Sequence, residues 1–244
     1  EGRRISTQLG HRMAVGYVPD PFGHVGQLPQ ILQGFGLDNF IFSRGLLDTD
    51  RVTMEFHWSA PDGSCVLAIH QRFWYNNAAF LGYPIEWGDT ENLRFDMALA
   101  LRQIRESVEN LVRETRGRSQ LLNNGVDHSE HQPELPRIVA RAQQEFPDWD
   151  ISIGSFEDYI QNIKKDLKGK RISRHSGELT YRYGDLLTGV YSARMYLKQA
   201  NHDCETLMER YAEPSEVLAR LAGKSDDTQA VIDYAWRELL KNCL

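Results

Sequence analysis

The stretch GYVPDPFGHVGQLPQIL, residues 16–32, joins the end of an apolar strand to the start of a helix. Pro19 and Pro21 each fix their own φ angle and keep the preceding residue out of the helical region. Asp20 lies between them, so its backbone is held extended and its carboxylate has a set direction. Working outward, residues 13–18 predict a strand and residues 23–35 predict a helix. We therefore expect Asp20 in the loop at the carboxyl end of the first strand.

Apolar runs and helical periodicities alternate along the next part of the chain. Strands are predicted over residues 39–43, 53–58, 65–70, 119–124 and 150–154, and helices over about 90–116, 134–146 and 156–167. Such alternation is typical of an α/β fold, a mostly parallel sheet flanked by helices. A polar stretch follows, and from about residue 189 only helical patterns remain. We predict an α/β domain over residues 1–178 and a helical domain over residues 179–244.

The composition argues against several classes of protein. The net charge is −6, without a long basic run, which disfavours a nucleic-acid-binding surface. No stretch approaches about 18 apolar residues and no signal-like segment opens the chain, so neither a membrane nor a secreted protein is predicted. The three cysteines are far apart, which suits a reducing compartment. We expect a cytoplasmic globular protein.

Several chemically active side chains follow the predicted strands. Asp20 follows the first strand, Arg44 the second, the loop at residues 72–77 the strand at 65–70, and Asp127 with His128 the strand at 119–124. Because the carboxyl ends of parallel strands meet at one edge of a sheet, these side chains are expected to converge.

Two carboxylates on one edge are the minimum set for glycoside hydrolysis, one as nucleophile and one as general acid and base. Trp74 and Tyr75 offer apolar platforms for sugar rings, and the amides of Asn76 or Asn77 can bind hydroxyl groups.

The spacing alone also permits a metal-dependent hydrolase of another type. The residues that could act as metal ligands are Asp20, His24, Asp127, His128 and His131. Pro21 and Gly23 disfavour a helix that would place Asp20 and His24 on one face, so His24 is predicted to be a hydrogen-bonding residue at the helix N-terminus.

Five stretches together carry a family resemblance: GYVPDPFGHVGQLPQILQGFG, FIFSRG, LLNNGVDH, HSGEL and GVYSARMYLKQAN. They resemble the glycoside hydrolase family 38 α-mannosidases of the bacterial and archaeal cytosolic type. The resemblance implies a retaining, exo-acting enzyme that cleaves terminal α-linked mannose with the help of a zinc ion. It also implies a seven-stranded, barrel-like α/β catalytic domain followed by a three-helix bundle.

The resemblance assigns roles to individual residues. Asp20 corresponds to the nucleophile and a zinc ligand, and Asp127 to the acid/base. Arg44 resembles the arginine that lines the sugar-binding subsite, and the other expected substrate-binding residues are Trp74, Tyr75, Asn76 and His128.

The remaining zinc ligands of the family fall before residue 1 and after residue 244. We therefore expect an incomplete segment, lacking N-terminal strand and bundle residues, that when isolated either self-associates or is marginally stable. The sequence also allows a homo-oligomer. Two alternatives stay open, another zinc-dependent hydrolase on an α/β scaffold and a non-catalytic sugar-binding fragment.

Overall fold

The structure is a computed structural model that describes residues 2–46, 52–85, 88, 90–180, 187, 189–224 and 228–243. The chain divides into two compact units, Glu1–Leu187 and Thr188–Leu244. The first unit extends past residue 178, because Leu179 is buried in its core. The assignment of the two parts as a catalytic and a bundle domain stays a prediction.

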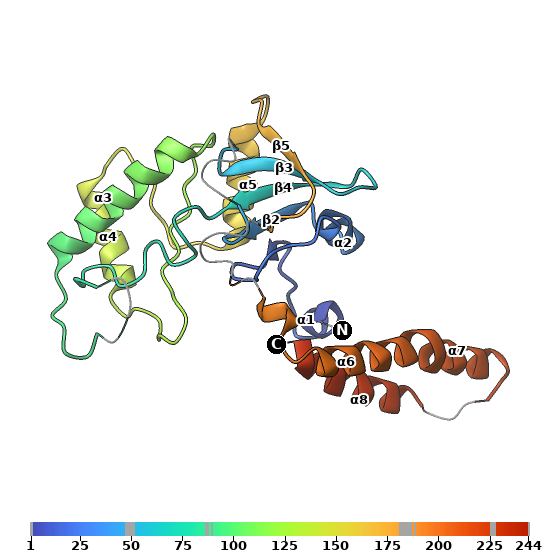
Figure 1. The fold of residues 1–244 in the computed structure, drawn as a ribbon. Coiled ribbons are helices and arrows are strands. Elements are labelled where there is room, and N and C mark those ends of the chain that lie inside the picture. The colour runs from blue at the N-terminus through green and yellow to red at the C-terminus, as the bar shows by residue number, and fades with distance from the viewer. Residues whose placement is uncertain are drawn as a thin grey trace. The chain divides into compact units, whose positions relative to one another are not determined.

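The first unit is built on a five-stranded sheet (Figure 1). In spatial order its strands are β1 (Gly16–Tyr17), β2 (Asn39–Phe42), β4 (Cys65–His70), β3 (Glu55–Ser59) and β5 (Ser173–Ser176). The pairs β1–β2, β2–β4 and β3–β5 are parallel, and only β3–β4 is antiparallel. The predicted mixed α/β class with a mostly parallel sheet is confirmed, whereas the seven-stranded, barrel-like form is not.

The antiparallel pair is a hairpin whose turn spans residues 60–64. The Ala60 N–H donates to the Ser64 carbonyl at 2.8 Å, and the Asp62 side chain caps Ser64. Gly63 has a φ of +89°, which glycine adopts without strain. This turn lies at the sheet edge opposite the carboxyl ends of β1, β2 and β4.

Two predicted strands are absent from the described residues. The segment at 119–124 binds a neighbouring loop instead of a strand: the Ala78 N–H donates to the Asn123 carbonyl at 3.0 Å, and the Asn77 amide donates to the Leu121 carbonyl at 3.0 Å. Residues 150–154 also form no strand, and the Ile151 carbonyl accepts from the Gln143 side chain. Both apolar segments contribute side chains to the interior without joining the sheet ladder.

The helices of this unit are α1 (Gly2–Gln8), α2 (Leu28–Gly34), α3 (Met97–Glu114), α4 (Leu135–Glu145) and α5 (Phe156–Leu167). A reciprocal capping box begins α5: Ser155 accepts from the Asp158 N–H, and Asp158 accepts from the Ser155 N–H. Asp96 caps α3 by accepting from the N–H groups of Ala98 and Leu99. The later start of α2 than predicted follows from His24, which forms a β-bridge with Leu179 instead of a helical turn.

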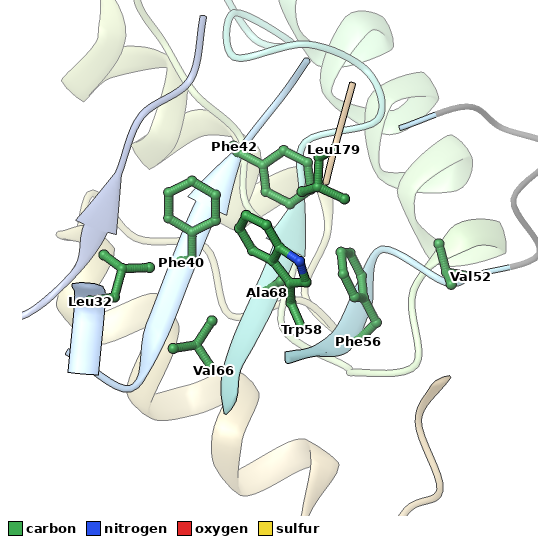
Figure 2. Packing of buried hydrophobic residues seen from close by; sticks show 9 residues of the cluster. All are labelled: Leu32, Phe40, Phe42, Val52, Phe56, Trp58, Val66, Ala68 and Leu179. Carbon is green, nitrogen blue, oxygen red and sulfur yellow. The ribbon is translucent and has the colours of Figure 1, made fainter. Parts of the chain in front are cut away.

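Alternate residues of the central strands pack on opposite faces of the sheet. Phe40 and Phe42 pack with Trp58 on the face covered by α2 (Figure 2), while Ile41 packs against α5. The Trp58 indole is fully buried and donates to the Gly177 carbonyl at 2.9 Å, so its one polar group is satisfied. A third cluster joins α3 and α4 through Ile104 and Ile138.

The second unit is helical. It contains α6 (Met195–Leu207), a π-helical turn (Met208–Ala212), α7 (Glu213–Leu221) and α8 (Gln229–Leu240). Three side-chain hydrogen bonds between described residues tie α8 and the residues after it to the earlier helices: Arg220 donates to Gln229 at 3.1 Å, the Trp236 indole to Glu213 at 2.7 Å, and the Asn242 amide to Asn201 at 2.9 Å. The predicted helical character is present, but a complete three-helix bundle is not confirmed. Among the described residues, no helix combines the length and apolar character needed to cross a bilayer.

Candidate active site

Asp20 lies in the loop after β1, and this loop is anchored to the neighbouring strand. The Val18 N–H donates to the Ile41 carbonyl at 3.1 Å, and the Ser43 N–H donates to the Pro19 carbonyl at 3.0 Å. The backbone therefore continues alongside β2 up to Asp20. The Asp20 side chain is about one third exposed, which leaves its carboxylate accessible.

Arg44 follows β2 and holds the Asp20 carboxylate. Its Nε–H donates to Asp20 Oδ1, while only 12% of the Arg44 side chain is exposed. The guanidinium also lies over two aromatic rings, 4.8 Å from the centre of Trp74 and 5.4 Å from that of Phe22. The ion pair occupies Oδ1 of Asp20.

Trp74 and Tyr75 lie in the loop after β4. Trp74 has a φ of +71°, an uncommon value for a large side chain that costs on the order of 1 kcal/mol or more. Its ring stacks on Tyr75 at a centroid distance of 5.3 Å, with Arg44 also over the Trp74 ring. The strained backbone thus places one aromatic ring against both the arginine and the tyrosine.

The Tyr75 hydroxyl connects the two predicted catalytic carboxylates. It donates to Asp127 Oδ2 at 3.0 Å. Burial raises the pKa of Tyr75 well above its ordinary value, and the adjoining carboxylates of Asp127 and Asp20 raise it further, so the phenol stays protonated. Asp20, Arg44, Trp74, Tyr75 and Asp127 therefore lie together, as predicted, although the strand predicted before Asp127 is not formed.

Asp127 is positioned by side-chain amides rather than by a strand. The Asn77 side chain accepts from the Asn123 N–H at 2.8 Å and donates to the Leu121 carbonyl. The Asn124 amide donates to the Ala78 carbonyl at 2.7 Å and to Gln132 at 2.9 Å. These bonds attach the segment before Asp127 to the loop that carries Tyr75. Asn77 is thus occupied by the backbone of this segment.

Asn76 and His128 have no described contact with the two carboxylates of this group. Asn76 lines a cavity of about 570 Å³ between its loop and α3, and Trp74 of the group lines the same cavity. His128 is exposed, with a φ of +62°, and within the described residues no contact joins its side chain to Asp20 or Asp127. Their predicted roles in substrate binding stay predictions.

Two residues near the site were missed by sequence reasoning, Tyr17 and Phe22. Phe22 lies under the Arg44 guanidinium. Burial raises the pKa of Tyr17, and the charge of Asp127 contributes to the same shift. The available signal was their position in the sequence: Tyr17 lies two residues before Pro19 and Phe22 directly follows Pro21, and residues close to a fixed carboxylate are carried to the same edge of the sheet.

His24 is not a cap of the following helix. It is 4% exposed, and its ring meets the edges or faces of Phe40, Phe42 and Trp58 at centroid distances of 5.1, 5.3 and 6.1 Å. Burial lowers the pKa of His24 to about 4, although a hydrogen bond to the Arg44 backbone acts in the opposite direction. The prediction that His24 is an N-terminal helix residue is wrong, because the Leu179 bridge draws it into the core.

Whether the site can bind a metal ion depends on how many ligand side chains lie close together. Structural and catalytic zinc sites use three or four His, Cys, Asp or Glu ligands. In the part of the chain that the structure describes, no three such side chains lie together. Asp20 is suited to one ligand position, since its carboxylate is accessible, but it does not make a site alone.

The Tyr75 hydroxyl gives a testable contribution. Tyr75→Phe removes one hydrogen bond to a carboxylate, worth about 1.5–3 kcal/mol, and we expect kcat to fall about tenfold or more with folding preserved. Tyr83→Phe is a matched control, because Tyr83 donates to Glu134 at 3.2 Å and has no described contact with Asp20 or Asp127. Equal losses in the two variants, measured by steady-state kinetics on the full-length protein, would contradict a role for Tyr75.

Because His24 is buried, we expect the free energy of unfolding to decrease in acid. Its native pKa lies below that of an unfolded histidine, so the unfolded chain binds more protons between about pH 6.5 and 4. Stability is therefore expected to fall as the pH drops through this interval, by about 3 kcal/mol from this residue. Urea unfolding at pH 7 and pH 4.5 measures it. His24→Phe should lose this dependence, and His131→Phe, at an exposed histidine, should keep it.

With this geometry in view, the chain can be compared with known proteins. Residues 2–183 match the model of the glycosyl hydrolases family 38 N-terminal domain. The match covers well over half of the chain, and the chain belongs to this family, as its motifs predict.

Individual relatives agree with the family. The crystal structure of an alpha-mannosidase from Enterococcus faecalis V583 matches with a TM-score of 0.84 and 28% sequence identity, over 99% of this chain and 26% of that chain. A curated protein of Halalkalibacterium halodurans, named "Putative mannosylglycerate hydrolase", is 33% identical over 246 aligned residues, covering 95% of this chain and 26% of that protein. The chain thus spans about a quarter of the length of these relatives.

Proposed function

We propose that this chain carries the nucleophile and the acid/base of a retaining, exo-acting α-mannosidase. The observation that supports this most is the position of Tyr75. Its hydroxyl donates to Asp127, and the nearby charge of Asp20 contributes to the raised pKa of the same phenol. Two carboxylates flanking one small region are the arrangement that glycoside hydrolysis requires. Membership of family 38 supports the choice of α-mannosides as the substrate class.

In the first step, Asp20 Oδ2 attacks the anomeric carbon of the terminal mannose. Arg44 holds Oδ1, so the orientation of the carboxylate is fixed. As the bond from carbon to the leaving oxygen breaks, Asp127 gives its proton to that oxygen, and a glycosyl ester of Asp20 forms.

In the second step, a water molecule attacks the same carbon and Asp127 takes its proton. The bond to Asp20 breaks, mannose is released with its original configuration, and both carboxyl groups return to their starting states. Tyr75 donates to Asp127 and positions it for both proton transfers.

We also propose that the complete protein uses zinc, with Asp20 as one of its ligands. Bound zinc would organise the hydroxyl groups of mannose and supply positive charge at the site. Treatment of the full-length protein with a chelator is expected to reduce turnover at least about tenfold, with recovery on addition of zinc. Unchanged turnover after metal removal, verified by metal analysis, would contradict this part of the proposal.

The substrate is tested directly on the full-length protein. We expect hydrolysis of 4-nitrophenyl α-mannoside, an α-linked mannobiose and mannosylglycerate, with the α-anomer of mannose as the first product by NMR. Nitrophenyl α-glucoside tests whether the enzyme is selective for mannose, and nitrophenyl acetate tests whether it is an esterase instead of a glycosidase. Formation of the β-anomer first would exclude retention, and turnover of the ester alone would favour a different hydrolase.

The proposal also covers the cellular location of the protein and its binding partners. We propose a cytoplasmic enzyme that binds mannose-containing glycosides and neither nucleic acid nor membranes, and that associates as a homo-oligomer. The acidic composition supports the absence of nucleic-acid binding.

A further inference from the structure

His24 is a buried polar side chain that the mechanism above does not use. Its ring is enclosed by Phe40, Phe42 and Trp58, and its Nε2 has no hydrogen-bond partner among the described residues. A buried ring nitrogen without a partner costs free energy, on the order of 1–3 kcal/mol. A phenylalanine ring in the same place would avoid this cost. Any benefit of a histidine here must therefore come from its other ring nitrogen, Nδ1.

That second nitrogen links His24 to the arginine of the site. The ring hydrogen-bonds to the Arg44 backbone, and this bond favours the protonated ring, as expected when a ring N–H donates to a carbonyl. Because Nε2 is unpartnered, the donor is Nδ1–H and the acceptor is the Arg44 carbonyl. From the same residue, the Arg44 side chain reaches Asp20.

The backbone on both sides of this contact is closely held. His24 and Leu179 exchange two backbone hydrogen bonds, each 3.0 Å long. Gly45, with a φ of +108°, passes so near Leu179 that a Cβ atom there would lie 2.4 Å from the Leu179 carbonyl oxygen. On the other side of Arg44, the Ser43 carbonyl bonds to His70 Nε2 at 2.8 Å. Within the segment from Ser43 to Gly45, the Arg44 carbonyl is the group that the His24 ring holds through a hydrogen bond.

We propose that His24 is a positioning residue, which holds the Arg44 peptide through Nδ1–H so that the Arg44 side chain keeps Asp20 in its attacking orientation. The kinetic part of this inference rests on the proposed function, but the structural part does not. A misplacement of about 1 Å at a reacting group costs up to about a hundredfold in rate, so the support of a single peptide matters.

Three variants at one position separate the two ring nitrogens. His24→Asn places an amide N–H near the position of Nδ1, His24→Gln places it near the position of Nε2, and His24→Phe keeps the ring and removes both nitrogens. We expect kcat of the full-length protein to fall about tenfold in His24→Gln and His24→Phe, with KM changed less than about threefold. His24→Asn should retain kcat within about threefold of the wild type.

A second measurement does not depend on turnover. The Arg44 Nε–H, bonded to Asp20, is expected to give a resonance protected from solvent exchange in ¹⁵N-edited NMR of the full-length protein, assigned by its loss in Arg44→Lys. The resonance should shift or broaden in His24→Phe and His24→Gln and persist in His24→Asn. Thermal unfolding monitors the fold of each variant.

The outcomes distinguish this inference from the proposed function. An unchanged Arg44 resonance in His24→Phe, or equal kcat losses in His24→Asn and His24→Gln, would overturn the role of His24. A wild-type protein that hydrolyses no mannoside would overturn the proposed function, while the resonance would still decide whether His24 positions Arg44.

Discussion

Asp20→Ala is expected to lower kcat of the full-length protein by more than about a thousandfold, because it removes the proposed nucleophile. The variant also leaves the Arg44 guanidinium without its carboxylate partner, so the site loses its ordered ion pair. Steady-state kinetics with 4-nitrophenyl α-mannoside measures the loss. Added azide, a small nucleophile, should react in the space left by the side chain and give a mannosyl azide of inverted configuration.

Asp38→Ala is the matched control for this variant. Asp38 also pairs with a cation, Lys164, at 2.6 Å, but its side chain is 69% exposed and it lies before β2, at the opposite end of the strand from Arg44. Its loss should leave kcat within about twofold, since exposed ion pairs contribute little. An Asp20→Ala protein with more than about a tenth of the wild-type kcat would mean that Asp20 is not the nucleophile.

Asp127→Ala should affect substrates according to their leaving groups. An alkyl or sugar oxygen needs a proton to depart, whereas a dinitrophenolate does not, so we expect losses of about 10²–10⁴-fold for mannobiose and much smaller losses in the first step for dinitrophenyl mannoside. Glu130→Ala, at an exposed carboxylate three residues away, is the control. Equal losses for both substrates would remove Asp127 from the role of acid.

Some elements of the fold were predictable because a local sequence pattern is enough to determine each of them. The runs at β2 and β4 are apolar on both faces, as expected for strands buried by helices on either side, and Ser155 with Asp158 marks the start of α5. The strand β5 was missed because its sequence, SRHS, is polar, and an edge strand with only half-buried side chains carries no apolar signal.

The incorrect strand at 119–124 shows where periodicity fails. Leu121 and Leu122 pack into different clusters, one beneath the sheet and one between α3 and α4, so they look like strand residues in the sequence. The partner of this segment is a loop, and its hydrogen bonds come from amide side chains that no periodicity reveals. Asp127 nevertheless reaches the expected edge.

For the candidate site, the strand-end argument was sufficient to bring Asp20, Arg44 and Tyr75 together. It could not find the Arg44 carbonyl as the partner of His24, because that contact depends on Leu179, more than 150 residues further along the chain. Long-range pairing of this kind is fixed by packing, not by local sequence.

The reversal of the chain at the β3–β4 hairpin has a practical consequence. Since the turn at residues 60–64 faces away from the strand ends that carry Asp20 and Arg44, a fluorophore or an immobilising tag attached there would be remote from any glycoside entering the site (Figure 1). Asp62 and Gly63 are exposed, and the turn is closed by its own hydrogen bonds. The hairpin therefore offers an attachment point for surface capture or single-molecule observation at the opposite end of the strands from Asp20 and Arg44.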